Sequence, residues 1–323
     1  MKKILITGVC GLIGSHLADA LLSKGYRVTG LDDLSVGKLN NIRHNLRDPK
    51  FKFVKADILD AKTLGRFVRR ADIVAHLAAA KKIGESGNAL DTLTVNIDGT
   101  RNIFEAAKNT KAKVLLASTS DVYGLSNDIP FREDGDLVIG SPTAKRWAYA
   151  VSKICAEQLA FSYYKEYKVP VVIVRYFGCF SPRASFTSTS GHIPLFIYAI
   201  LNDKAVVIHG DGKQTRSMGS VDDVVRGTVL AIQNHKAVGE IFNIGNDEEI
   251  SVIGSARLIH KIASTGKKLK LKFIPYKKIF GTYEDIRRRV PCLDKAKRVL
   301  GYRPEISLAD SIRHTIKIRR EAI

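Results

Sequence analysis

The chain has 323 residues, of which 45% are hydrophobic, and its formal net charge is +20. This length suggests about two domains with a sizeable core, and no apolar run approaches the ~18 residues that a transmembrane helix needs. An apolar stretch begins almost at once and leaves no room for a signal peptide, so we expect a cytoplasmic protein with no membrane partner.

The positive charge raises the question of a nucleic-acid partner. The basic residues are spread over the whole chain, however, and their densest run is residues 287–289. No aromatic surface on which a single-stranded nucleic acid could stack is visible, so we expect no specific nucleic-acid partner. We expect the positive charge to attract an anionic small substrate instead. Four scattered cysteines without a CxxC pair predict reduced structural thiols and no metal site: Cys10, Cys155, Cys179 and Cys292.

The first fourteen residues predict a dinucleotide-binding loop. Residues 3–6 are typical of a buried strand, and a loop with Gly8, Gly11 and Gly14 leads into an amphipathic helix. Glycine permits a tight turn and close backbone approach, and the helix N-terminus offers N–H groups to a diphosphate. The flanking strand and helix make the motif specific. An ordinary strand-to-helix turn is the alternative.

From this loop onward, strand-like and helix-like stretches alternate. Strands are predicted at residues 3–6, 26–31, 51–56, 72–77, 114–117 and 171–175, and helices at residues 12–22, 64–70, 91–108 and 149–167. This alternation implies βαβ crossovers and an α/β fold of the Rossmann type, a doubly wound parallel sheet. Because ligands bind at the carboxyl ends of such strands, we expect the functional residues just after them.

Acidic residues after the second and third strands indicate which dinucleotide binds. Asp32 ends the second strand about 20 residues past the glycine loop, where a carboxylate hydrogen-bonds the adenosine ribose and would repel a 2′-phosphate. NAD is therefore favoured over NADP. Asp33 could share this role, and Asp57 is a weaker candidate for an adenine contact. A capping or turn role is the alternative for Asp32.

The sequence HLAAAK at residues 76–81 comes after the fourth strand. Its small residues allow the backbone to close onto a flat ligand, and Lys81 can reach a phosphate or a ribose hydroxyl. His76 is expected to be a packed strand-end histidine rather than a catalytic base, although histidine is well suited to catalysis.

Candidate catalytic residues lie on two elements. Thr119 and Asp121 come after the fifth strand, and Tyr149 and Lys153 share one face of a predicted helix. A phenol has a pKa near about 10, but an adjacent ammonium and an oxidised nicotinamide would favour the phenolate. Lowering the pKa of Tyr149 by about three units requires interactions that favour the phenolate over the phenol by roughly 4 kcal/mol. Thr119 can hydrogen-bond and orient the substrate oxygen.

With these residues, the chain resembles the extended short-chain dehydrogenase/reductases, within the NAD-dependent nucleotide-sugar epimerase/dehydratase family. The matching stretches run in order over nearly the whole chain: GVCGLIG, HLAAAK, VNIDGT, STSDVYG, YAVSK, RYFGCFSPR, HGDGKQTR, FNIGN and KAKRVLGYRP. The resemblance implies catalysis by Thr119, Tyr149 and Lys153. It also implies a nucleotide-sugar substrate and a homodimer formed through the helices at residues 91–108 and 149–167.

The resemblance further implies which residues bind the two ligands. It places at NAD-contacting positions Gly8, Gly11, Leu12, Ile13, Gly14, Asp32, Asp33, Asp57, Ile58, Leu77, Ala78, Lys81, Asn96, Tyr149, Lys153 and Tyr176. It places Thr119, Gly178, Arg216 and Arg288, or an arginine near Arg288, on the substrate. Residues 1–178 and 219–247 would form the NAD domain, with a helix from residue 222 and a strand at 241–244. Residues 179–218 and 248–323 would form a smaller α/β substrate-binding lobe.

Three positions depart from the family pattern. Gly178 stands where an asparagine usually contacts the substrate phosphate, Ser181 replaces a glycine, and Cys292 replaces an aspartate. We expect all three on the substrate side of the site, so the resemblance does not identify the nucleotide or the sugar. The residues expected to carry out the oxidation match the family pattern.

The reaction depends on the step that comes after oxidation of C4 of the sugar. We expect a 4-epimerase of a UDP-hexose that re-reduces the 4-keto sugar on its other face. Asp121 favours the alternatives, because related decarboxylases and dehydratases carry a glutamate there while simple epimerases carry a neutral residue. It could then act as acid or base in UDP-glucuronate decarboxylation or 4,6-dehydration. A solvated carboxylate, and a non-catalytic NAD-binding protein, are the remaining alternatives.

Overall fold

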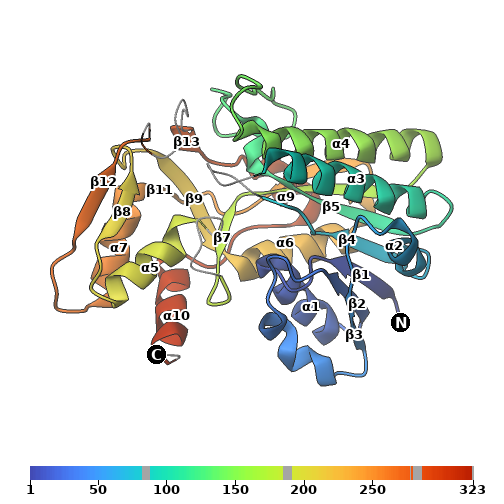
Figure 1. The fold of residues 1–323 in the computed structure, drawn as a ribbon, viewed down its shortest axis with the longest axis horizontal. Coiled ribbons are helices and arrows are strands. Elements are labelled where there is room, and N and C mark those ends of the chain that lie inside the picture. Colours follow the sequence, from blue (N-terminus) through green and yellow to red (C-terminus); the bar gives the residue numbers. More distant parts are fainter. Residues whose placement is uncertain (82–87, 185–190, 277, 279–285, 322–323) are drawn as a thin grey trace.

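The structure is a computed structural model that describes residues 1–81, 88–184, 191–276, 278 and 286–321. Its centre is a seven-stranded parallel sheet with the strand order β10-β6-β5-β4-β1-β2-β3 (Figure 1). The strands are β1 (Lys3–Thr7), β2 (Arg27–Asp32), β3 (Phe51–Lys55), β4 (Ile73–His76), β5 (Lys113–Thr119), β6 (Val171–Tyr176) and β10 (Glu240–Ile244). The order reverses between β1 and β4, which makes the predicted doubly wound sheet and opens a crevice at that point.

Helices cover both faces of this sheet (Figure 1). One face carries α1 (Leu12–Ser23), α6 (Val221–Gln233) and α9 (Asp294–Leu300), and the other carries α2 (Ala61–Val68), α3 (Ala89–Ala107) and α4 (Trp147–Tyr167). Within β1, Ile4 and Ile6 pack on the α1 side and Leu5 packs on the α3 side, because successive strand residues point to opposite faces. Both faces of the strand are buried, which explains its unbroken apolar sequence.

Capping residues fix where several helices begin. Asp60 accepts a hydrogen bond from the Thr63 N–H at 3.0 Å, and Asn88 accepts one from the Leu90 N–H at 3.0 Å. These side chains satisfy N–H groups that the first helical turn leaves without a partner. Helices α2 and α3 therefore start three and two residues earlier than the apolar pattern predicts.

A smaller lobe lies beyond the carboxyl ends of the main sheet (Figure 1). Its strands are β7 (Gly178–Phe180), β9 (Thr215–Ser220), β11 (Glu249–Ser251) and β13 (Arg288–Arg289) in one sheet, and β8 (Val206–His209) and β12 (Leu271–Ile274) in another. Its helices are α5 (His192–Leu201), α7 (Val252–Ala263) and α10 (Leu308–Glu321), packed around an apolar core of their own.

The chain then returns from the smaller lobe to the main sheet. β9 runs directly into α6, whose N-terminus is capped by the Ser220 hydroxyl at 3.1 Å from the Asp222 N–H. β10 pairs in parallel with β6, so the strand predicted at residues 241–244 is confirmed. The exact limits of the two lobes remain a prediction. None of the helices in the described ranges has the length and hydropathy to cross a bilayer.

Candidate active site

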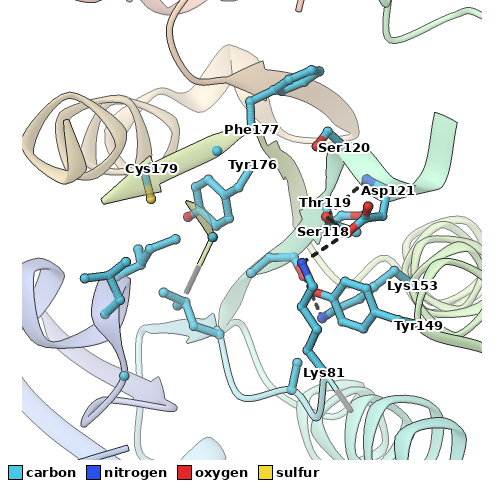
Figure 2. Close-up of a pocket in the computed structure, with 18 of the residues that line it drawn as sticks. Lys81, Ser118, Thr119, Ser120, Asp121, Tyr149, Lys153, Tyr176, Phe177 and Cys179 are labelled. Carbon is cyan, nitrogen blue, oxygen red and sulfur yellow. Dashed lines mark hydrogen bonds and ion pairs between the residues drawn. The ribbon is translucent and has the colours of Figure 1, made fainter. Parts of the chain in front are cut away.

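A pocket opens at the carboxyl ends of β1, β4, β5 and β6 (Figure 2), and residues of β9 and β13 also line it. It brings together most of the predicted site residues: Gly8, Gly11, Leu12, Ile13, Gly14, Leu77, Lys81, Thr119, Asp121, Tyr149, Lys153, Tyr176, Gly178 and Arg216. Residues more than two hundred positions apart thus face one cavity. That arrangement is what a doubly wound sheet predicts for a ligand site.

The glycine loop fits a dinucleotide diphosphate. Gly8 has a φ of +73°, and a Cβ on Gly14 would lie 2.2 Å from the Gly8 carbonyl oxygen, so both positions require glycine. Gly11 is the N-cap of α1, and no side chain caps this helix within the described loop. The first turn of α1 thus presents backbone N–H groups and a positive dipole end at the pocket. These residues would hold the diphosphate of NAD.

The predicted adenosine contacts lie outside the pocket lining. Asp32 is buried, and its carboxylate accepts hydrogen bonds from the Cys10 N–H and the Leu34 N–H, both at 2.9 Å. Burial raises the pKa of Asp32. Asp33 accepts hydrogen bonds from Ser35, and Asp57 accepts one from the Leu59 N–H. Asp32 therefore braces the glycine loop against the end of β2, and its contact with a ribose remains a prediction.

Two polar residues near the fourth strand have structural partners. His76 is fully buried between the hydroxyls of Thr7 at 2.8 Å and Thr100 at 3.1 Å. Burial lowers its pKa to about 3, so it stays neutral and packed, as predicted. Asn96, expected at an NAD-contacting position, accepts a hydrogen bond from the Ala80 N–H at 2.7 Å. Its amide nitrogen donates to the Ala80 carbonyl and to the Ser152 hydroxyl, both at 2.9 Å. Asn96 thereby fixes the chain next to Lys81 against α4.

Tyr149 and Lys153 project from α4 into the pocket (Figure 2). The Lys153 ammonium donates a hydrogen bond to the Ala117 carbonyl at 2.9 Å. Burial lowers the pKa of Lys153 to about 8, while the nearby Glu157 raises it. Burial and the charge of Asp121 raise the pKa of Tyr149, against a hydrogen bond with Thr119 that lowers it. The residues around Tyr149 thus raise its pKa, and the positive charge of an oxidised nicotinamide would act in the opposite direction.

Asp121 is the centre of a charged cluster at the mouth of β5. Its carboxylate pairs with the Arg289 guanidinium at 2.7 Å and with the Lys81 ammonium at 3.2 Å, and Figure 2 shows Lys81 reaching it across the pocket. Burial alone would raise the pKa of Asp121, but Arg289, Lys81 and Arg146 outweigh burial and hold that pKa well below its usual range. Asp121 is therefore a fixed, ionised carboxylate and not a solvated one.

A buried ion pair lies beneath the catalytic helix. Glu157, one turn after Lys153, accepts hydrogen bonds from Arg175 at 2.8 and 3.0 Å and from the Ser118 hydroxyl at 2.5 Å. Both charged side chains are at most 5% exposed. This pair joins α4 to the ends of β5 and β6. The pair was not predicted from the sequence, although an acidic residue four positions after Lys153 was a visible signal.

The substrate end of the pocket is built mainly by β9 and its neighbours. Arg216 lines the pocket and donates hydrogen bonds to the carbonyls of Thr215 at 2.7 Å and Ile286 at 2.8 Å. Arg288, predicted on the substrate, lies outside and binds the Glu249 carboxylate at 2.8 to 3.1 Å. Adjacent strand residues point to opposite faces. Arg289, the neighbour of Arg288, lines the pocket, and the contact of either arginine with a substrate remains a prediction.

The three departures from the family pattern are not all at the pocket. Gly178 lines it, opposite Met218 of β9. The Ser181 hydroxyl instead forms a hydrogen bond with the His16 ring at 3.0 Å. The Cys292 N–H donates a hydrogen bond to the Phe131 carbonyl at 2.8 Å. Neither Ser181 nor Cys292 belongs to the pocket lining. Of the three departures, the change at residue 178 therefore acts on a bound substrate most directly.

Known proteins resemble the chain over almost its full length. A family model described as GDP-mannose 4,6 dehydratase matches residues 5–315. UDP-N-acetyl-alpha-D-glucosaminuronate decarboxylase from Bacillus cytotoxicus is 37% identical over 322 residues, which cover 99% of this chain and 98% of that protein. UDP-glucuronic acid decarboxylase 1 from Xenopus tropicalis is 31% identical over 100% of this chain and 73% of that protein. UDP-glucuronic acid 4-epimerase from Bacillus cereus, solved with UDP-glucuronic acid and NAD, has a TM-score of 0.88 and 32% identity, covering 99% of this chain and 100% of that one.

Proposed function

The chain belongs to the GDP-mannose 4,6-dehydratase family of NAD-dependent nucleotide-sugar enzymes, and from this premise we propose that it decarboxylates a UDP-linked uronic acid. The observation that carries the proposal is Asp121, an ionised carboxylate fixed between Lys81 and Arg289 in the pocket. The resemblance associates an acidic residue at this position with decarboxylases and dehydratases. The relatives named as decarboxylases, at 37% and 31% identity, favour this reaction over the 4-epimerase expected from the sequence.

The proposed chemistry begins at C4 of the sugar. Thr119 orients the C4 hydroxyl by a hydrogen bond, and the Tyr149 phenolate accepts its proton. The positive charge of the Lys153 ammonium stabilises that phenolate. NAD, when bound, takes the hydride from C4 and later returns it. The resulting C4 ketone is two carbons from the C6 carboxylate. The C5–C6 bond then breaks, its electron pair moves toward the ketone oxygen, and carbon dioxide leaves before C5 gains a proton.

The charge state of Asp121 decides its part in these steps. A carboxylate whose pKa is held far below neutrality is a poor proton donor. We therefore propose that Asp121 anchors Lys81 and Arg289, and that the proton for C5 comes from another group. The Lys81 ammonium, 3.2 Å from Asp121, is a donor at this place. The cluster has a net positive charge, which suits a substrate that carries a diphosphate and a carboxylate.

Product analysis tests the proposal. The purified chain would be incubated with UDP-glucuronate, UDP-N-acetylglucosaminuronate, UDP-glucose and dTDP-glucose, and the products identified by mass spectrometry and NMR. We expect a product that has lost the mass of carbon dioxide from one or both uronates. Loss of water from a neutral sugar would establish a dehydratase instead. Tight NAD binding with no product from any of the four would favour a non-catalytic protein.

A 4-epimerase of a UDP-uronate is the second candidate. The solved Bacillus cereus structure that superposes with a TM-score of 0.88 is named as such an epimerase and contains UDP-glucuronic acid and NAD. This candidate uses the same oxidation at C4 but keeps C6. In the same incubation it predicts a product of unchanged mass with inverted C4, which would exclude decarboxylation as the main reaction.

Substituting the two adjacent arginines one at a time tests whether Arg289 or Arg288 contacts the substrate. Arg289→Ala is expected to lower kcat/KM for the substrate by roughly tenfold or more, because hydrogen bonds to charged groups contribute about 1.5–3 kcal/mol. Arg288→Ala removes a half-exposed pair with Glu249 and is expected to change kcat/KM by less than about twofold. Steady-state kinetics of both variants measures this. Equal losses would contradict the placement.

We also propose that the chain is a homodimer formed through α3 and α4. The exposed apolar side chains on these helices, Leu90 at 68%, Tyr167 at 51% and Tyr164 at 36%, suit a contact between copies. Light scattering on a sizing column would give twice the chain mass. Tyr167→Glu is expected to halve the measured mass, whereas Phe273→Glu on the exposed face of β12 is expected to leave it unchanged. A monomeric wild-type chain would refute the proposal.

A further inference from the structure

Lys153 carries its positive charge at a buried position. The residue is 2% exposed, and its ammonium donates a hydrogen bond to the Ala117 carbonyl at 2.9 Å. Burial disfavours the charged form of a lysine, and it lowers the pKa of Lys153 to about 8. Under the proposed function, however, the positive charge of Lys153 stabilises the Tyr149 phenolate. A nearby negative charge that opposes the effect of burial would therefore support the reaction.

Glu157 provides a negative charge one helical turn after Lys153. Side chains four residues apart on a helix lie about 5–6 Å from each other at their Cβ atoms. Glu157 is 4% exposed, so salt and water screen its interaction with Lys153 much less than at the surface. Its charge raises the pKa of Lys153, in opposition to burial. Glu157 thus favours the ammonium form of the lysine.

The other titratable groups around Lys153 do not replace Glu157. His76 on β4 is fully buried, and burial together with the charge of Lys153 lowers the pKa of His76 to about 3, so its ring is neutral. Tyr149 on α4 is a neutral phenol in the chain without cofactor, because burial and Asp121 raise its pKa. Asp121, just after β5, is already paired with two other cations.

Three hydrogen bonds fix the carboxylate of Glu157. Two come from the Arg175 guanidinium on β6, at 2.8 and 3.0 Å, and one comes from the Ser118 hydroxyl on β5, at 2.5 Å. Ser118 is the register partner of Arg175 and directly follows Ala117, which accepts the hydrogen bond from Lys153. Two consecutive residues of β5 thus hold two successive turns of α4.

We infer that Glu157 is a positioning residue, which keeps the Lys153 ammonium charged and held against the end of β5. The inference rests on the C4 oxidation of the proposed function and deepens it. Arg175 and Ser118 fix where the carboxylate lies, and the carboxylate supplies the charge that Lys153 needs. The decarboxylase and the 4-epimerase share this oxidation, so the role of Glu157 is the same for either product.

The two halves of the ion pair provide a matched pair of variants. Glu157→Gln removes the carboxylate charge and Arg175→Gln removes the cation, and each leaves one buried charge without its partner. Carbon-13 NMR titration of the full chain, labelled at the Cε atoms of its lysines and free of cofactor, would report the pKa of Lys153. We expect this pKa to fall by about one pH unit or more in Glu157→Gln and not to fall in Arg175→Gln.

Lys113 is an internal control for this titration. It is also a buried lysine whose pKa burial lowers to about 8, and its ammonium donates to three backbone carbonyls near the end of α6. It lies at the start of β5, five residues before Ser118, which is about 16 Å along a strand. The pKa of Lys113 should be the same in all chains, and Lys153→Arg would identify the signal of Lys153.

Equal falls in the pKa of Lys153 in both variants would overturn the inference, because a general loosening of α4 would then explain them. So would an unchanged pKa in Glu157→Gln. If a single variant does not fold, the double variant Glu157→Gln/Arg175→Gln leaves neither charge unpaired, and the pKa of Lys153 should still fall in it.

Activity provides a second readout. With NAD and UDP-uronate, the activity of Glu157→Gln should decline at a lower alkaline pH than that of the wild-type chain, because Lys153 loses its charge earlier. A decline at the same pH would contradict the inference. A wild-type chain that forms no product refutes the proposed function, whereas the titration needs neither cofactor nor substrate and decides the role of Glu157 separately.

Discussion

Replacing Tyr149 by phenylalanine is expected to lower kcat/KM by a factor of about 10²–10⁴, the usual contribution of a positioned acid or base. The half-buried phenol lines the pocket beside Thr119 and Asp121. Tyr176, the other phenol among the described residues that line the pocket, cannot replace it, because its hydroxyl is paired with the Thr228 hydroxyl at 2.8 Å. NAD binding should be retained, since the glycine loop is untouched. Product formation by mass spectrometry and NAD binding by fluorescence would measure both.

The control for this variant is Tyr164→Phe on the same helix. Tyr164 lies on the outer surface of α4 and is 36% exposed, so its replacement should leave kcat/KM within about twofold. In the wild-type chain, activity should also rise with pH, because the phenolate is the reactive form and burial raises its pKa. A phenylalanine variant with nearly full activity would remove Tyr149 from the proposed chemistry.

Replacing Glu157 by alanine is expected to lower the free energy of unfolding by about 3–5 kcal/mol. The change leaves the Arg175 guanidinium buried without its carboxylate and removes the acceptor of the Ser118 hydroxyl. An uncompensated buried charge is among the most destabilising changes in a protein interior. Urea unfolding followed by circular dichroism measures the loss as a lower midpoint at an unchanged slope.

Glu249→Ala provides the matched surface control. Its pair with Arg288 has comparable distances but both side chains are partly exposed, at 27% and 47%. Exposed pairs contribute about 0–1 kcal/mol, so the unfolding midpoint should hardly move. If the two alanine variants were equally stable, burial would not be what makes the Glu157–Arg175 pair important.

The main sheet and the residues that line the pocket were predictable because local signals specify them. Six strands of the main sheet are predicted by short apolar runs, and the glycine loop, Tyr149 and Lys153 are predicted by spacing along one segment. Helix starts were less well predicted, because Asp60 and Asn88 shift them through single side-chain hydrogen bonds. The cofactor was also predicted correctly: known structures of similar fold contain NAD.

The substrate side was less predictable because it depends on contacts between distant segments. The choice between Arg288 and Arg289 depends on how β13 pairs with β9, more than seventy positions earlier. Gly178 appeared as an isolated departure from the family, and only the register with Met218 shows what fills its place. Spacing within one segment carries no information about either pairing.

Three consecutive arginines at residues 287–289 bind three different carboxylates, those of Asp211, Glu249 and Asp121. A strand of two residues is weakly held in register, and a slip by one position exchanges which side chain faces inward. In this run, a slip of one or two positions still delivers a guanidinium to the cavity. We therefore expect the repetition to keep a guanidinium at the cavity if this pairing shifts. Replacing Arg288 and Arg289 together should therefore weaken substrate binding by more than the sum of the single effects, which a double-mutant cycle would measure.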